Sequence, residues 1–313
     1  MKIGDLTSDQ LHQRFGGAGL RARIGPFVFR LRSSIASFVE DFGFAYADFP
    51  VCDESKVSDF RIRLAPAPRW RPWREAMARF CAEEVSPFET FPRRIALPWV
   101  EWGFNWCIYT YAHQFLIFHS AVVERGGRAV ILAGPSGSGK STLCAALLGR
   151  GWRLLSDEFA LLDPEHGWLL PIPRPVALKD ASIELIATLL PHARLGRVFA
   201  ATRKGRITHL LPPVDAVERQ AEPAKPAWVV FPTRADSAVT KLEPLRKAAG
   251  FVRLETNCFN YRELGRSAFE ALGNMIEEAS CFALPFADVE TAAELVDGLA
   301  EVQPAAAVPL DAA

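Results

Sequence analysis

The sequence predicts an α/β protein in which a P-loop domain with a mixed sheet follows a smaller N-terminal α+β domain. Residues 134–141 satisfy the pattern G-x-x-x-x-G-K-[ST], between an apolar β-rich run and a helix-forming run, which is the context this motif requires. A Gly-Gly pair at 126–127 joins two strand-like runs just before the motif and indicates a hairpin. The segment before Pro98 mixes alternating and helical patterns, as a separate α+β unit does.

The composition is that of a globular chain. Half of the 313 residues are hydrophobic, and 36 basic residues balance 36 acidic ones. This neutral balance gives no support for a nucleic-acid partner. No apolar run reaches the roughly 18 residues of a membrane span, the first residues lack a signal-peptide pattern, and the cysteines are scattered. We therefore expect a reduced, cytoplasmic compartment and no membrane partner.

The first 95 residues predict the accessory domain. Leu20–Leu31 looks strand-like, Ser33–Phe44 fits a short helix, and Ser58–Leu64 alternates as a half-buried strand does. The arginine- and tryptophan-rich stretch 66–73 can be read as a surface that stacks nucleic-acid bases, but packing of stems and rings in a small domain is the simpler interpretation.

The central residues lead into and out of the motif. Trp99–Tyr111 carries apolar residues on every face and should be buried, and Gln114–Val123 is a strong strand signal. The strand that feeds the motif should therefore have an antiparallel partner immediately before it. After the motif, Gly151 ends a helix and Trp152–Leu155 forms a short strand.

The remaining elements follow in order. Ala201–Pro213 places Arg203, Lys204 and Arg206 around a glycine; the stretch is suited either to stabilising a transferring phosphoryl group or to forming a solvated basic turn. Further expected elements are a helix capped near Asp180 or Ser182, a strand at 227–231, a helix at 262–278, a strand at 281–286 and a helix at 288–301. We expect domains at 1–95 and 96–302 and a frayed tail at 303–313.

The motif residues have the types that phosphate binding demands. Glycines let the backbone curl around an anion with its N–H groups inward, and the following helix presents its positive end to the same anion. The Lys140 ammonium would reach the β- and γ-phosphates, and the Ser141 hydroxyl would bind Mg²⁺.

Two further observations complete the candidate site. Asp157 and Glu158 end the strand after the motif helix, where phosphoryl transfer needs acids for the metal and for the proton of the attacking hydroxyl. His119 would lie near the phosphates on the strand before the motif, although a lone histidine on a strand is more often a core residue. No L-S-G-G-Q or N-K-x-D string is present, so transporter ATPases and GTPases are disfavoured.

These pieces together resemble the HPr kinase/phosphorylase family. The resemblance covers about Phe115–Leu162: a histidine on the preceding strand, Gly-Pro-Ser-Gly-x-Gly-Lys-Ser at 134–141, and Arg150-Gly followed by a strand and an acid pair. Thr142 stands where the family usually has Glu, Glu158 stands where it has a second Asp, and the later Glu-x-Arg-Gly-Leu-Gly signature is absent. The chain thus looks more like a divergent HPr kinase-related group, with 202–205 and 259–261 as family features.

The resemblance implies a domain of the HPr kinase/PEP carboxykinase-like type and a role for each matching residue. Asp157 would be the general base, Glu158 would assist the metal or the base, and His119, Arg203 and Arg206 would line or complete the phosphate site. Ser141, Asp157 and Glu158 would hold the metal. The nucleotide phosphates would be held by Gly134, Pro135, Ser136, Gly137, Ser138, Gly139, Lys140, Ser141 and Thr142.

The resulting expectation is an ATP- and Mg²⁺-dependent kinase that phosphorylates a serine- or threonine-type hydroxyl on a small protein or peptide. The wider group includes kinases of short natural-product precursor peptides, some encoded beside small peptide-binding chaperones, so such a chaperone is an expected partner, and a homo-oligomer is reasonable. Two alternatives stay open: a small-metabolite kinase, and a regulatory switch that binds ATP without transferring a phosphoryl group.

Overall fold

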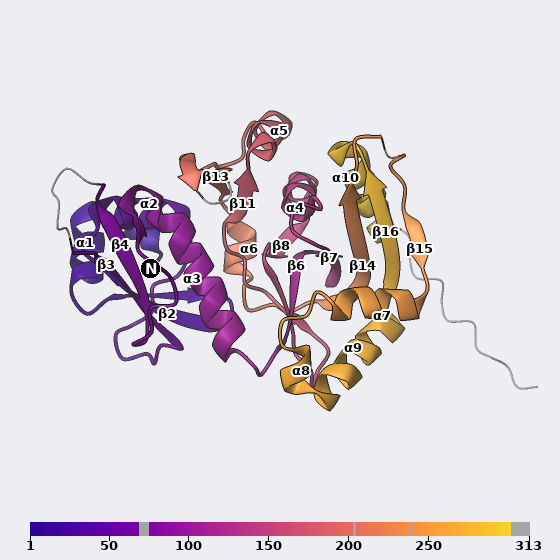
Figure 1. Ribbon diagram of the computed structural model, residues 1–313, viewed down its shortest axis with the longest axis horizontal. Helices are drawn as coiled ribbons and strands as arrows, with labels where there is room; N and C mark the ends of the chain where they lie inside the picture. The colour runs from indigo at the N-terminus through magenta and orange to yellow at the C-terminus, as the bar shows by residue number, and fades with distance from the viewer. Residues whose placement is uncertain (69–74, 203–204, 238, 302–313) are drawn as a thin grey trace, which may run out of the picture.

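The structure is a computed structural model that describes residues 1–68, 75–202, 205–237 and 239–301. The described residues form a mixed α/β arrangement with three sheets (Figure 1). Arg203, Lys204 and the expected tail at 303–313 lie outside the described residues.

The first sheet is built from the N-terminal residues. Its strand order is β1-β2-β3-β4-β5, in which β2 and β3 are parallel and the other neighbours antiparallel. The strands are β1 (Leu20–Ile24), β2 (Phe27–Ser33), β3 (Phe60–Pro66), β4 (Met77–Ala82) and β5 (Phe91–Pro92). The helices are α1 (Ser8–Gly16), α2 (Ala36–Ala45) and α3 (Ala96–Tyr111), with short 3₁₀ turns at Ile3–Asp5 and Arg93–Ile95.

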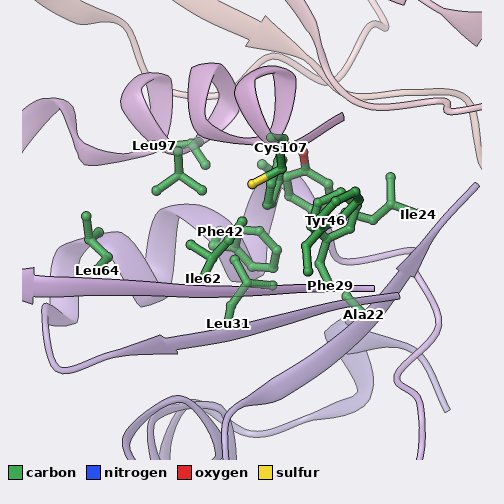
Figure 2. Close-up of a cluster of buried hydrophobic side chains, with 14 of the residues drawn as sticks. Ala22, Ile24, Phe29, Leu31, Phe42, Tyr46, Ile62, Leu64, Leu97 and Cys107 are labelled. Atoms are coloured by element: carbon green, nitrogen blue, oxygen red, sulfur yellow. The ribbon is translucent and has the colours of Figure 1, made fainter. Parts of the chain in front are cut away.

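One face of this sheet forms the first hydrophobic core. Alternate residues such as Phe29, Leu31, Ile62 and Leu64 are buried against α2 and α3, and Figure 2 shows their side chains between the strands and the helices. The expected strand at 20–31 is instead the hairpin β1–β2. It turns at Gly25, where φ is +59° and a Cβ would lie 2.2 Å from the Pro171 carbonyl oxygen, so only glycine fits this turn.

The second sheet carries the glycine-rich motif. Its order is β10-β9-β6-β7-β14-β16-β15, and β8 also pairs with β6. The predicted antiparallel partner is confirmed, because β6 pairs antiparallel with β7 across the 126–127 turn. β7, β14 and β16 run parallel. The strands are β6 (Leu116–Arg125), β7 (Arg128–Ala133), β8 (Arg153–Ser156), β9 (Phe159–Leu162), β10 (Leu169–Leu170), β14 (Lys225–Arg234), β15 (Glu243–Leu245) and β16 (Ser280–Phe286).

Helices cover both faces of the second sheet. Val130 and Leu132 of β7 share a core with α4 (Lys140–Gly149) and α10 (Val289–Glu301), whereas Ile131 packs with α9 (Arg266–Glu278) on the other face. This alternation is the side-chain period of a strand. The expected helix at 262–278 is divided at Gly265 into α8 (Tyr261–Leu264) and α9, and α7 (Lys247–Glu255) packs beside α9.

A small third sheet lies between α3 and α4 in Figure 1. It consists of β11 (Val176–Lys179), β13 (Gly205–Leu210) and β12 (Phe199–Thr202), so much of the stretch expected as a basic loop is strand. The helix α5 (Ala181–Leu189) follows β11, and α6 (Val214–Glu218) follows β13. Asp180 precedes α5 as predicted, but its carboxylate accepts from the Arg206 N–H rather than from the helix.

The long apolar helix α3 lies directly after the expected domain boundary. Its Phe104 and Ile108 belong to the first core, as do Ile117 and Phe159 of the following segment. Tyr109 and Tyr111 at its end remain exposed. The division at residue 95 stays a prediction. None of the helices in the described part of the chain combines the length and apolar character that a membrane span requires.

Candidate functional site

The glycine-rich loop joins the end of β7 to the start of α4. Gly139 is the residue before α4 and has φ of +97°, and a Cβ at this position would lie 2.5 Å from Cζ of Phe286. Both the backbone conformation and the close approach of β16 therefore require glycine. The loop brings successive backbone N–H groups to the N-terminus of α4, which is the arrangement that binds anions.

Lys140 lies beneath this loop. Its ammonium donates hydrogen bonds to the carbonyl oxygens of Gly134 (2.6 Å) and Pro135 (2.9 Å), and the residue is buried. Burial lowers the pKa of Lys140, while the charges of Asp157 and Glu158 act in the opposite direction. The sequence thus places a cation inside the loop and within the electrostatic reach of the acid pair.

Asp157 follows β8 and is 5% exposed. Its Oδ2 accepts a hydrogen bond from the Ala177 N–H at 3.2 Å, whereas its Oδ1 is buried without a hydrogen-bond partner among the described residues. Burial, followed by the charge of Glu158, raises the pKa of Asp157 to about 7; the Ser141 hydroxyl acts against this shift. A carboxylate with a pKa near neutrality is suited to accept a proton at physiological pH.

His119 and Glu158 line the same cleft as Asp157 and lie close to each other. Nδ1 of His119 is 3.9 Å from Oε2 of Glu158, and the imidazole packs edge-on against Phe259. The main-chain N–H of His119 donates to the Asn257 carbonyl at 2.7 Å, which fixes this part of β6. The histidine therefore lies beside Glu158 and lines the same cleft as the glycine-rich loop, whereas its expected role near the phosphates stays a prediction.

One cleft of about 410 Å³ brings most of the expected residues together. A volume of this size is within the range of small-ligand sites. The expected residues that line it are His119, Ser136, Gly137, Gly139, Lys140, Ser141, Thr142, Asp157 and Glu158. Gly134 and Pro135 contribute through their carbonyl contacts with Lys140, and Ser138 is buried within the loop.

Of the cations predicted around Gly205, the structure describes only Arg206, and it lies away from the cleft. Arg206 is exposed at the start of β13, its guanidinium pairs with Glu184 of α5, and it is not among the residues that line the cleft. Arg203 lies outside the described residues. The catalytic roles of both arginines stay predictions.

Two cations that line the cleft were not singled out from the sequence. Lys179 ends β11, and Arg234 ends β14. Because β14 is parallel to β7, its last residue lies at the same sheet edge as the glycine-rich loop. The sequence predicted the buried strand at 227–231 but not its direction relative to β7. Without that direction, the sequence does not indicate that the residue at the end of this strand reaches the glycine-rich loop.

A second, smaller pocket adjoins the cleft on the far side of Asp157. Asp157, Glu158, Ala177 and Lys179 line both spaces. Its other wall comes from α3, the third sheet and the segment that leads into β11, and the residues there are Pro98, Glu101, Trp102, Asn105, Arg174, Pro175, Ile207 and His209. Its free volume is about 20 Å³, roughly enough for one or two water-sized groups.

Three of the residues that line this small pocket carry polar atoms without partners in the described part of the chain. Nε of Arg174, Nδ1 of His209 and Oδ1 of Asp157 are all buried and have no hydrogen-bond partner among the described residues. The Arg174 guanidinium is otherwise held by Glu101, with its Nη1 3.2 Å from Oε2. Burial lowers the pKa of His209 to about 4, so its imidazole is neutral near pH 7. Buried polar atoms normally find a partner, so each of these atoms lacks a hydrogen bond that a bound group or a water would supply.

The residues present fit Mg²⁺ that arrives with a nucleotide. Among the described residues no cluster of three or more histidine, cysteine or acidic side chains could hold a metal on its own. Mg²⁺, however, is commonly bound by one or two carboxylates together with substrate phosphates and water. The unpartnered Oδ1 of Asp157, the adjacent Ser141 hydroxyl and Glu158 supply oxygen ligands of that kind.

Comparisons with known proteins give two similarities. The family model described as SynChlorMet cassette protein ScmC matches residues 101–173, which include the glycine-rich loop and the acid pair. Among solved structures, the Hpr(Ser) kinase/phosphatase from Coxiella burnetii is similar over 59% of this chain and 96% of its own, with 12% identity and a TM-score of 0.28. At this TM-score the similarity supports no conclusion about fold or activity. No curated protein matches the chain.

Proposed function

We propose that the chain is an ATP- and Mg²⁺-dependent kinase that transfers the γ-phosphoryl group to a serine- or threonine-type hydroxyl of a peptide or small protein. One observation supports this most directly: a glycine-rich loop with Lys140 and Ser141 faces Asp157 and Glu158 across a single cleft. These are the parts of a P-loop phosphotransferase, with anion-binding backbone, a phosphate-contacting lysine, a hydroxyl for Mg²⁺ and an acid for the acceptor proton.

The cleft would hold the nucleotide phosphates. The loop N–H groups and the N-terminus of α4 would bind the phosphate oxygens, and the Lys140 ammonium would exchange its contacts with the loop carbonyls for the β- and γ-phosphates. Lys179 and Arg234 add positive charge to the same cleft. Bound Mg²⁺ would neutralise phosphate charge, held by Ser141 with Asp157 or Glu158.

The acceptor hydroxyl would enter from the small pocket, because Asp157 lies between the two spaces. In the transfer, the acceptor oxygen forms a bond to the γ-phosphorus, and the bond between that phosphorus and the ADP oxygen breaks. The proton of the hydroxyl passes to the carboxylate of Asp157. The raised pKa of Asp157, about 7, favours this proton transfer near neutral pH.

The small pocket bears on the choice of acceptor. A metabolite kinase needs a closed, polar pocket beside Asp157, and this pocket is polar and partly enclosed. Its free volume of about 20 Å³ nevertheless accommodates only a group of about hydroxymethyl size. The side chain of a serine would fit this volume while the rest of the acceptor peptide stays outside the pocket, whereas a whole metabolite would not fit. We therefore keep the peptide or small-protein acceptor as the main proposal and the metabolite as the alternative.

The experiment has two stages on the full chain. Nucleotide binding is measured first with a fluorescent ATP analogue, with and without Mg²⁺. Transfer is then measured with Mg²⁺ and ATP by intact mass, with the short peptides encoded beside the gene as acceptors. We expect a gain of one phosphoryl group on a peptide. Lys140→Ala should lose both binding and transfer, and Asp157→Asn should lose transfer but retain binding.

Other outcomes separate the alternatives. Lys241→Ala, an exposed lysine that pairs with Glu243 away from the cleft, serves as the matched control and should behave as the unchanged protein. Binding without transfer to any peptide, but with ADP release in a pool of small alcohols, would favour a metabolite kinase. Binding without any transfer would favour a switch. A chain that binds no nucleotide would overturn the proposal.

A further inference from the structure

The outer face of the first sheet carries a cluster of arginines, here called the arginine face. Arg21 lies directly opposite Arg30 in the β1–β2 pair, and Arg30 lies beside Arg61 in the β2–β3 pair. Two register positions along, and so on the same face, Arg32 lies beside Arg63. The arginine face consists of Arg21, Arg23, Arg30, Arg32, Arg61 and Arg63.

Strand alternation places these side chains opposite the first core. Leu20, Ala22, Leu31 and Ile62 alternate with the arginines and are buried against the helices. Arg32, Arg61 and Arg63 are exposed, and the other three arginines are half-exposed. The face therefore points away from α3 and from the nucleotide cleft, so its role is independent of the proposed transfer reaction.

This concentration of charge is unusual for a chain whose basic and acidic residues balance. Directly opposite side chains in a sheet have Cβ atoms only about 4.5–5.5 Å apart, and like charges there are destabilising. Burial and the charges of Arg21, Arg32 and Arg61 accordingly lower the pKa of Arg30, while the charge of Glu54 acts in the opposite direction. The six arginines repel one another in the free protein, and an anion bound across them would remove that cost.

Few groups within the described residues neutralise the face. Arg61 lies 4.0 Å from Glu83, which is the one carboxylate salt bridge that the six arginines make in the described part of the chain. Arg30 donates to the Ala18 carbonyl at 2.6 Å. Nε and Nη1 of Arg21 are buried and have no hydrogen-bond partner among the described residues. The exposed side chains of Arg32 and Arg63 make no salt bridge within the described residues, so their guanidinium donors are accessible to an external acceptor.

We propose that the arginine face binds an acidic protein segment in an extended conformation. Alternate side chains on a strand are about 6.6–6.8 Å apart, and an extended acidic segment running along β2 and β3 repeats its carboxylates at the same spacing. The planar guanidinium presents paired N–H donors that match a carboxylate in a bidentate manner. The two sets of charges therefore correspond in both spacing and chemistry.

A protein segment fits the face better than a nucleic acid does. Surfaces for single-stranded nucleic acid combine cations with aromatic side chains on which the bases stack. On this face of the described strands the remaining residues are not aromatic; they are Val28, Ala65, Met77, Arg79, Cys81 and Pro92. Among the described strand residues, the face offers cations for carboxylates but no aromatic side chain on which a base could stack.

Fluorescence polarisation on the full chain tests the proposal. The probe is a dye-labelled dodecapeptide of alternating Glu and Gly, and its controls are the Gln–Gly peptide and a thymidine dodecamer of the same label. We expect the acidic peptide to bind most tightly and its affinity to fall as salt rises. Arg32→Gln with Arg63→Gln should weaken binding of the acidic peptide by about five- to twentyfold.

A matched variant controls for the loss of overall charge, and a stability measurement controls for unfolding of the variant. Arg262→Gln with Arg266→Gln removes the same charge from exposed positions on α8 and α9 and should leave binding unchanged. The Arg32/Arg63 variant should unfold at the same or a higher temperature at low salt, because repulsion is relieved. Three outcomes would overturn the proposal. The neutral peptide could bind as tightly as the acidic one, the thymidine dodecamer could bind more tightly, or both double variants could lose the same affinity for the acidic peptide.

Discussion

At the scale of single residues, Asp157 combines deep burial with an unpartnered carboxylate oxygen. Its pKa is raised from 3.8 to about 7 in the folded chain, first by burial and then by Glu158. Between these two values the folded state holds a proton that the unfolded state has released. Stability must therefore fall as pH rises from about 4 to about 7 and then level off. The site keeps an acid that is unfavourable for folding, as sites of function often do.

This gives a prediction for Asp157→Asn in nucleotide- and Mg²⁺-free protein. The variant lacks the titrating group, so it should be more stable than the unchanged protein at pH 8, by at most about 4 kcal/mol, and the difference should shrink toward pH 5. Thermal and urea unfolding at both pH values measure this. A stability difference that does not vary with pH would show that Asp157 does not titrate in this range.

At the scale of elements, the glycine-rich loop offers a matched pair of substitutions. Gly137 and Gly139 both have positive φ, but a Cβ at Gly137 would meet nothing within 4 Å, whereas a Cβ at Gly139 would lie 2.5 Å from Cζ of Phe286. Gly137→Ala should cost about 1 kcal/mol of stability through its backbone conformation alone. Gly139→Ala should cost clearly more, because β16 or the start of α4 must also shift. Urea unfolding compares the two, and equal losses would contradict the close contact.

The elements that the sequence predicted were those with local signals. The Gly-Gly turn with apolar runs on both sides defined β6 and β7, and the motif located the start of α4. Turns inside otherwise continuous patterns were missed, at Gly25 despite the turn signal of the Gly25-Pro26 pair, and at Gly265. A glycine with an unusual φ inside an apolar pattern interrupts an element without changing the pattern around it.

Residues brought in by long-range pairing could not be found in the same way. Lys179 and Arg234 join the cleft only because β11 and β14 are positioned by strands distant in sequence. Likewise the alternation at 58–64 predicted a half-buried strand, but only the register of β3 with β2 brings Arg61 beside Arg30. Strand direction and register depend on the whole sheet, and a single segment does not contain them.

At the scale of the whole molecule, a buried ion pair connects α3 with the segment that leads into the third sheet. Nη1 of Arg174 lies 3.2 Å from both the carbonyl and the Oε2 of Glu101, and Tyr46 donates to Oε1 of Glu101 at 2.5 Å. The pair also lines the small pocket beside Asp157. The same contacts therefore hold the two parts of the chain together and shape the proposed entrance for the acceptor.

Removal of the Arg174 charge should accordingly lower the stability of the full chain and not only that of one of the two connected parts. Burial raises the pKa of Glu101 and Arg174 opposes that shift, so Arg174→Met leaves a buried carboxyl without its cation. We expect a loss of about 3–5 kcal/mol, seen by urea unfolding of the full chain. Glu101→Gln combined with Arg174→Met removes both charges and should recover much of this loss. If the double variant were as unstable as the single one, the contact of the Arg174 guanidinium with the Phe104 ring, and not the ion pair, would hold α3 in place.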